Sequence, residues 1–255
     1  MVPVCETCVG RVVRHQFLGC GRCGEAVDLA FEMEDIRFAG MLAGGLLCRD
    51  CRLAAPEFVR AVAYGSYDME MRGLIALLKF HGVRGVARLL GWQMAEAILQ
   101  LEGEAAAELL VIAVPLFKER ERQRGYNQSV LLAGEALRRL KRLRPGWKLS
   151  AAHEMLERRK STESSFVLSR KGRRRNLSGA FKMRGDVRGR EVLLVDDILT
   201  SGATARECAR VLMAAGAAKV WVATLARAQK GFVRQLRDDP GEMVATWDLA
   251  AVQTF

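Results

Sequence analysis

The sequence predicts an α/β fold in which helices flank a central, mostly parallel sheet, with a small Cys-rich module in front of it. Short unbroken apolar runs alternate along the chain with segments of helical period, the pattern of parallel strands joined by helices. A chain of 255 residues, half of them hydrophobic, can bury a substantial core. Six of the seven cysteines fall within the first 51 residues. We therefore expect a Cys-rich module over residues 1–55 and one α/β domain over residues 56–255.

Each expected element follows from a local pattern. Helices are indicated where apolar residues recur every three or four positions, as in Met71, Leu74, Ile75 and Leu78. Buried strands are indicated by unbroken apolar runs. The polar, arginine-rich stretch 154–175 has neither pattern and is predicted to be mostly a mobile loop. The expected strands are 58–64 (followed by a turn at Gly65-Ser66), 109–114, 192–195 and 220–225, and the expected helices are 69–80, 86–101, 126–143 and 204–215.

The charge of the chain indicates an anionic partner. The formal net charge is +11, which favours nucleic acid or a phosphate-rich small molecule. Between residues 158 and 190, 12 Lys or Arg stand against two acids, so much of this charge lies inside the expected α/β domain. No apolar run approaches the length of a spanning helix, and a Cys pair stands where a secretion signal would place its apolar stretch. We expect a cytoplasmic protein that does not insert into membranes.

The segment after strand 192–195 carries candidate chemistry. Asp196 and Asp197 follow the strand directly, and carboxylates at the carboxyl end of a buried strand can accept hydrogen bonds from vicinal ribose hydroxyls. The start of the next helix offers unpaired N–H groups and a positive dipole end, which suit a phosphate. A glycine there lets the backbone approach the anion closely. The candidate phosphate-binding residues are Thr200, Ser201, Gly202, Ala203 and Thr204.

The run V-L-L-V-D-D-I-L-T-S-G-A-T resembles the signature of the type I phosphoribosyltransferases. The resemblance implies the type I phosphoribosyltransferase fold and a site in which the acids hold the ribose 2- and 3-hydroxyls of phosphoribosyl diphosphate. It also implies Mg²⁺ between the diphosphate and the ribose hydroxyls. Two other interpretations stay open: the acids cap a helix, or they bind a metal in another α/β fold. Relatives acting on 6-oxopurines carry an aspartate at the position of Thr200, so hypoxanthine or guanine salvage is disfavoured.

A basic segment follows strand 109–114. Leu116, Phe117 and Lys118 begin a charged loop, and its cations are placed to cover a diphosphate. Arg122 and Arg124 are the candidates for neutralising charge that develops during catalysis. The alternative is a solvated helix start with alternating charges.

Several sequence blocks occur in one order. L-K-F-H-G, P-L before R-G-Y-N-Q, R-x-x-N-L-x-G-A-F and the acidic run all follow the N-terminal Cys pairs. That order is similar to the ComF family of competence-related proteins, up to about residue 227. The resemblance implies a role in DNA uptake, with single-stranded DNA and components of the uptake machinery as partners. The chain departs from relatives in having Ser165 where many carry Gln, and three Cys pairs where many have four.

The cysteines form three C-x-x-C pairs, a spacing typical of metal ligands in a chain without a secretion signal. Two such pairs supply the four sulfurs that a structural Zn²⁺ needs. Gly24 directly follows the Cys20/Cys23 pair and suits the tight turn of a zinc knuckle. This favours a site made of the Cys20/Cys23 and Cys48/Cys51 pairs. Joining the first two pairs is equally simple, and His15 is a further candidate ligand; a redox array of thiols is a weaker alternative. The candidate ligands are Cys20, Cys23, Cys48 and Cys51 in the first pairing, and Cys5 and Cys8 with Cys20 and Cys23 in the second.

Three functions follow from these features. The first is a pentosyltransferase that transfers a ribosyl phosphate from phosphoribosyl diphosphate, or a related phosphosugar, with diphosphate as leaving group. The second is a non-catalytic accessory protein that binds single-stranded DNA through its basic segments; aromatic residues barely interleave with those segments in the sequence, which weakens this alternative. The third is a ligand-sensing regulator. No residue identifies an acceptor, and the segment after residue 227 carries no motif that we can interpret.

Overall fold

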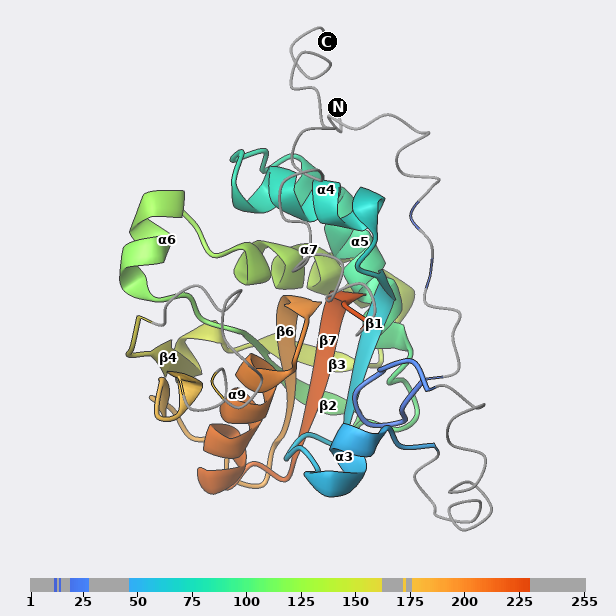
Figure 1. Ribbon diagram of the computed structural model, residues 1–255, viewed down its shortest axis with the longest axis vertical. Coiled ribbons are helices and arrows are strands. Elements are labelled where there is room, and N and C mark those ends of the chain that lie inside the picture. Colours follow the sequence, from blue (N-terminus) through green and yellow to red (C-terminus); the bar gives the residue numbers. More distant parts are fainter. Residues whose placement is uncertain are drawn as a thin grey trace, which may run out of the picture.

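The computed structural model describes residues 12, 14, 19–27, 46–161, 172 and 176–229, and its elements are shown in Figure 1. The helices are α3 (Arg49–Leu53), α4 (Met69–Lys79), α5 (Val86–Leu99), α6 (Lys118–Arg124), α7 (Gln128–Leu143), the 3-10 turn η1 (His153–Met155) and α9 (Ala203–Ala214). The strands are β1 (Arg60–Ser66), β2 (Glu108–Ala113), β3 (Lys148–Ala151), β4 (Leu156–Arg158), β5 (Phe181–Met183), β6 (Glu191–Leu199) and β7 (Lys219–Arg227).

Five strands form one sheet in the order β1-β7-β6-β2-β3, and every neighbouring pair is parallel. The predicted parallel sheet is therefore confirmed. In a parallel sheet the carboxyl ends of all strands meet at one edge, which is where α/β proteins bind ligands. Strand β6 lies in the middle of this sheet, so the residues at its carboxyl end are surrounded by protein on both sides.

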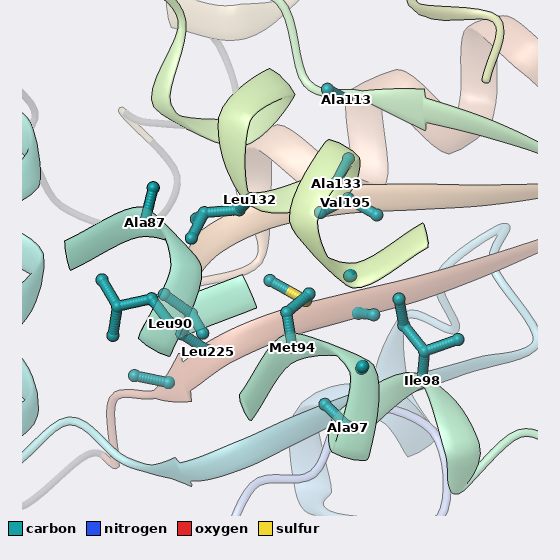
Figure 2. Packing of buried hydrophobic residues seen from close by; sticks show 14 of the residues in the cluster. Ala87, Leu90, Met94, Ala97, Ile98, Ala113, Leu132, Ala133, Val195 and Leu225 are labelled. Carbon is teal, nitrogen blue, oxygen red and sulfur yellow. The ribbon is translucent and has the colours of Figure 1, made fainter. Parts of the chain in front are cut away.

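Helices cover both faces of the sheet. Figure 2 shows α5 and α7 placing Leu90, Met94 and Leu132 against the strands, where each side chain is fully buried. The other face packs against α9 through a second apolar cluster that includes Cys208 and Leu212. Two strands apart from the sheet, β4 and β5, pair antiparallel.

Helices α5 and α7 touch at Gly91. A Cβ atom added at Gly91 would lie 2.1 Å from the Cβ of Glu135, so only glycine lets the two backbones come this close. This contact fixes α5 against α7 over their middle turns. The first turn of α7 lies against β6, where the Ser129 hydroxyl donates to Asp196.

Two local expectations were wrong in detail, and two short strands lie where the sequence predicts none. Gly65 and Ser66 do not turn, because they continue β1 and pair with Ala226 and Arg227 of β7. The charged segment after β2 is not a loop but helix α6, closed by Gly125 in the left-handed region at φ 78°. Strand β4 begins inside the stretch expected to be a loop, of which 162–171 and 173–175 lie outside the described residues. Strand β3 lies in a segment for which the sequence predicts no element.

Among the described residues, no helix is long and apolar enough to cross a bilayer.

Candidate functional site

The acidic pair lies inside strand β6 and not beyond its end. Asp196 pairs in register with Thr224 of the neighbouring strand β7, and the strand continues to Leu199. Asp197 is 4% exposed, and its Oδ2 atom lies 2.6 Å from the ammonium of Lys79 at the end of α4. A carboxylate this buried needs such a partner, because an unpaired charge would be strongly disfavoured there.

Asp196 stands in a different environment. Its Oδ1 atom accepts hydrogen bonds from the hydroxyl of Ser129 at 3.0 Å and from the backbone N–H of Asp197 at 2.9 Å. Burial, together with the neighbouring Asp197 carboxylate, raises the pKa of Asp196 to about 7. The raised pKa favours the protonated form of the Asp196 carboxyl, which can donate as well as accept a hydrogen bond.

The loop after β6 has the geometry of an anion site. Gly202 adopts φ 72°, which a residue with a side chain takes only under strain, and α9 begins at the next residue. Within the described part of the chain, no side chain caps this helix start. Thr200 is exposed and Thr204 is half-buried, so both hydroxyls lie near the first turn with access to solvent. The amides and hydroxyls that a phosphate requires are present together.

Two cavities lie beside this loop. One, of about 420 Å³, is lined by Ser201, Gly202 and Ala203 on one side and by the Cys-rich module on the other. The second, of about 410 Å³, lies between that module and β1. Asp196 and Asp197 line neither of them. Asp197 is buried against Lys79, whereas Asp196 keeps part of its surface accessible.

Helix α6 carries the predicted diphosphate cations. Arg124 donates a short hydrogen bond to the side chain of Gln128, the first residue of α7. Arg122 pairs with Glu119 of its own helix at 3.6 Å and is mostly exposed.

Lys118 lies 3.8 Å from Glu157 of β4, and Phe117 forms the N-cap of α6 directly after Leu116. The ion-pair partners of Lys118 and Arg122 in the structure are thus glutamates of β4 and α6, and the predicted roles of Leu116, Phe117, Lys118 and Arg122 stay predictions.

Four cysteines from the N-terminal module meet in one cluster. The Sγ atoms of Cys20, Cys23, Cys48 and Cys51 all lie within 4.8 Å of one another. The Cys23 and Cys48 sulfurs are 3.7 Å apart, close to the roughly 3.8 Å that a tetrahedral site with Zn–S bonds of about 2.3 Å requires. The donor set and its spacing therefore fit a structural Zn²⁺.

The cluster agrees with the first of the two pairings expected from the sequence. Gly24 makes the knuckle turn at φ 65°, with its N–H donating to the Cys20 carbonyl at 2.9 Å. The alternative ligands Cys5, Cys8 and His15 lie outside the described residues.

Sequence reasoning missed the partners of the acids. Lys79 is the lysine of the L-K-F-H-G block, which indicated a family but no role. Ser129 follows the R-G-Y-N-Q block, and Asn127 in that block caps α7 by accepting from the Ser129 N–H at 2.9 Å. Lys79 of the first block and Ser129, next to the second, thus supply contacts to Asp197 and Asp196 that the sequence did not predict.

This parallel sheet, its acid-bearing central strand and the four-cysteine cluster define a protein with a phosphoribosyltransferase-type domain and a small metal-binding module. A family model described as a phosphoribosyl transferase domain matches residues 127–253. The DNA utilization protein YhgH of Escherichia coli O157:H7 is 34% identical over 184 residues, which cover 71% of this chain and 78% of that protein.

Competence protein F of Haemophilus influenzae is 28% identical over 230 residues, covering 88% of this chain and 90% of its own. Competence protein ComFC of Bacillus subtilis is 27% identical over 190 residues, with coverages of 71% and 72%. The chain belongs to the ComF family, as the order of its sequence blocks indicates.

Proposed function

We propose that the chain binds phosphoribosyl diphosphate, or a related phosphosugar, at the loop between β6 and α9, and that it serves DNA uptake as the names of its relatives indicate. One observation carries the proposal. An uncapped helix start with Gly202 in the left-handed region follows a central strand whose last residues include two carboxylates. The match to the phosphoribosyl transferase domain supports the same assignment.

The residues have distinct roles in this proposal. The amides and hydroxyls of the loop accommodate the 5-phosphate, and Asp196 and Asp197 accept hydrogen bonds from the ribose hydroxyls. Because Lys79 and Ser129 hold these carboxylates in the ligand-free chain, the ribose has to displace or share both contacts. The ligand therefore exchanges existing polar contacts for its own, and this exchange favours a diol over a group with a single hydroxyl.

Magnesium fits the same donor set, since it prefers carboxylate and phosphate oxygens, and it would neutralise the charge of the diphosphate. If turnover occurs, the reaction is pentosyl transfer, in which the bond to diphosphate breaks as an acceptor bonds to the anomeric carbon. The protein then acts by positioning the sugar and by stabilising charge, the role predicted for Arg122 and Arg124.

Titration calorimetry with phosphoribosyl diphosphate and Mg²⁺ tests the proposal. We expect Asp196→Asn and Asp197→Asn to weaken binding by at least tenfold, since each removes a charged acceptor for the ribose hydroxyls. Asp186→Asn is the matched control, because Asp186 is exposed and pairs with Arg188 on the surface. Absence of binding to the wild-type chain, or unchanged binding by both site variants, would overturn the proposal.

A second candidate function, binding of single-stranded DNA, is favoured by an arginine–aromatic stripe on the helical layer. Arg124 lies over the ring of Phe80, which is 74% exposed, at 5.7 Å, and Arg84 lies over Tyr126 at 4.6 Å. These partners are far apart in the sequence. The weak interleaving of aromatic and basic residues in the sequence therefore does not describe the folded surface.

The stripe continues along the line where α5 meets α7. Arg88 of α5 and Arg139 of α7 lie 5.2 and 4.8 Å from the ring centre of Trp92, which is 37% exposed. The exposed rings of Phe80 and Trp92, each next to at least one guanidinium group, offer both stacking surface and positive charge to an unpaired strand.

Anisotropy of a labelled oligonucleotide tests this second function. We expect Trp92→Ala and Phe80→Ala each to weaken binding about fivefold or more, as loss of one stacked base predicts. Leu53→Ala, which removes an equally exposed apolar side chain away from the stripe, should leave the affinity unchanged. Equal affinities for all three variants would exclude the stripe as the DNA surface.

A further inference from the structure

The Cys-rich module is joined to the phosphate loop by one buried arginine. Arg227, the last residue of β7, is 4% exposed. Its Nε atom donates to the carbonyl of Cys23 at 3.0 Å. Its Nη1 atom donates to the carbonyl of Leu199 at 2.8 Å and makes a short contact with the carbonyl of Thr200. A single guanidinium thus contacts a predicted metal ligand and the first residue of the loop.

The orientation of this arginine is set by the module. The Arg227 Nη2 atom lies 2.5 Å from Glu25 Oε2, and both side chains are 5% exposed. Glu25 follows the knuckle turn after Cys23, so its position depends on the fold of the cysteine cluster. A buried ion pair is weak evidence for stability, since its desolvation offsets most of the attraction. It does fix the direction in which the guanidinium points.

A second arginine joins the module to the helix that follows the loop. Arg206, in the first turn of α9, donates from Nη1 to the carbonyl of Ala54 at 2.7 Å. Its Nη2 atom lies 3.8 Å from the Cys51 sulfur. The cysteine cluster is therefore attached at both ends of the loop, to residues 199–200 through Arg227 and to α9 through Arg206. The cavity of about 420 Å³ lies between these two attachments.

We propose that Arg227 is a positioning residue through which the metal-bound cysteine cluster holds the phosphate loop in its binding conformation. The inference rests on the proposed function. Glycine at position 202 gives the loop conformational freedom, so its shape has to be imposed by neighbouring groups. The Arg227 hydrogen bonds to residues 199 and 200 impose it from the side of the module. Loss of the metal frees Glu25 and the Cys23 carbonyl, and the loop then samples other conformations.

Such a connection is reciprocal. If metal in the cluster raises the affinity of the loop for its ligand by a given factor, ligand on the loop raises the affinity of the cluster for metal by the same factor. Zinc release is therefore a readout of ligand binding that needs no catalytic turnover.

The experiment compares three variants with the wild-type chain. Arg227→Gln removes the guanidinium, Arg227→Lys keeps the charge without the forked geometry, and Glu25→Gln keeps the arginine without its ion pair. Arg22→Gln is the matched control, because Arg22 lies in the same module and donates to the Pro56 carbonyl at 3.0 Å, away from the loop. Zinc content and cooperative unfolding are measured for each, followed by calorimetry with phosphoribosyl diphosphate and Mg²⁺.

We expect both Arg227 variants to retain zinc but to bind the ligand at least tenfold more weakly than wild type. The affinity of Glu25→Gln should lie between those of the Arg227 variants and wild type. Arg22→Gln should bind within twofold of wild type. Saturating ligand should slow zinc loss to a chelator in the wild-type chain but not in Arg227→Gln. Wild-type affinity in Arg227→Gln, or zinc loss that ignores the ligand, overturns the inference.

Hydrogen exchange of the amides of residues 200–205 separates this inference from the proposed function. In the wild-type chain without ligand, these amides should exchange several-fold faster once zinc is removed. That result stands even if the chain does not bind phosphoribosyl diphosphate or if the Arg227 variants fail to fold. Unchanged exchange after zinc removal would overturn the coupling whatever the ligand proves to be.

Discussion

Replacing Asp196 with asparagine should make the protein more stable and less able to bind its ligand. The pKa of Asp196, about 7, lies some three units above its ordinary value of 3.8. Between these two values the native chain holds a proton that the unfolded chain has released. Stability therefore falls as pH rises from about 4 to about 7, and the cost is complete above pH 7. An uncharged amide of the same shape avoids that cost.

The size of the effect follows from the shift. At about 1.4 kcal/mol per unit, three units correspond to at most about 4 kcal/mol. Asp196 is only partly buried by its accessible surface, and asparagine also loses the charge-assisted bonds from Ser129 and from the Asp197 amide. We expect a net gain of about 1–2 kcal/mol at pH 8, which raises the melting temperature by about 3–6 °C in a chain of this size.

Thermal unfolding of Asp196→Asn and wild type between pH 4 and pH 8, followed by circular dichroism, measures this difference. The advantage of the variant should shrink steadily toward pH 4. Asp186→Asn should differ from wild type by an amount that stays constant over this range, because hydrogen bonds from Arg188 lower the pKa of Asp186 to about 2 and so place its titration below pH 4. The reasoning predicts that the variant is more stable than wild type at pH 8 and that this difference depends on pH. A less stable variant, or a difference that does not change with pH, would refute a raised pKa for Asp196.

Two glycines offer matched tests of the packing and of the loop. Gly91→Ala should destabilise the chain by about 1–3 kcal/mol in urea unfolding, because the added Cβ has no room between α5 and α7. Gly134→Ala is the control, because a Cβ at this position of α7 meets open space, and it should be neutral or slightly stabilising. Gly202→Ala and Gly189→Ala both place a side chain at φ near 70° and should each cost about 1 kcal/mol. Only Gly202→Ala should also weaken ligand binding in calorimetry, and equal binding by the two variants would contradict a phosphate site at the loop.

The sequence predicts the sheet well because its strands are buried on both faces. The run 109–114 is apolar throughout and 220–225 is apolar except for Thr224, a composition typical of a strand buried in a parallel sheet. The same rule fails at the end of β6. Asp196 and Asp197 look like residues that follow a strand, but their backbones continue the ladder while their side chains are satisfied by α4 and α7.

Other features leave no local signal. Helix α6 buries none of its residues, so it lacks the apolar period by which helices are recognised. Arg227 looks like an ordinary cation at the end of a strand, and its partner Glu25 is 202 residues away in the chain. The four-cysteine cluster, by contrast, can be predicted from the sequence. The C-x-x-C spacing and the requirement for four ligands limit the candidate sites to a few pairings.

The unfavourable electrostatics of this chain are gathered around the carboxyl end of β6. Asp196 has a raised pKa, Asp197 is buried against Lys79, and Arg227 is buried against Glu25, all at or next to the residues that precede the phosphate loop. The clusters on the two faces of the sheet, in contrast, consist of hydrophobic residues. Buried charges and displaced pKa values are characteristic of binding and catalytic sites, where geometry matters more than stability. Their position at one edge of the sheet is consistent with the ligand site proposed for the loop between β6 and α9.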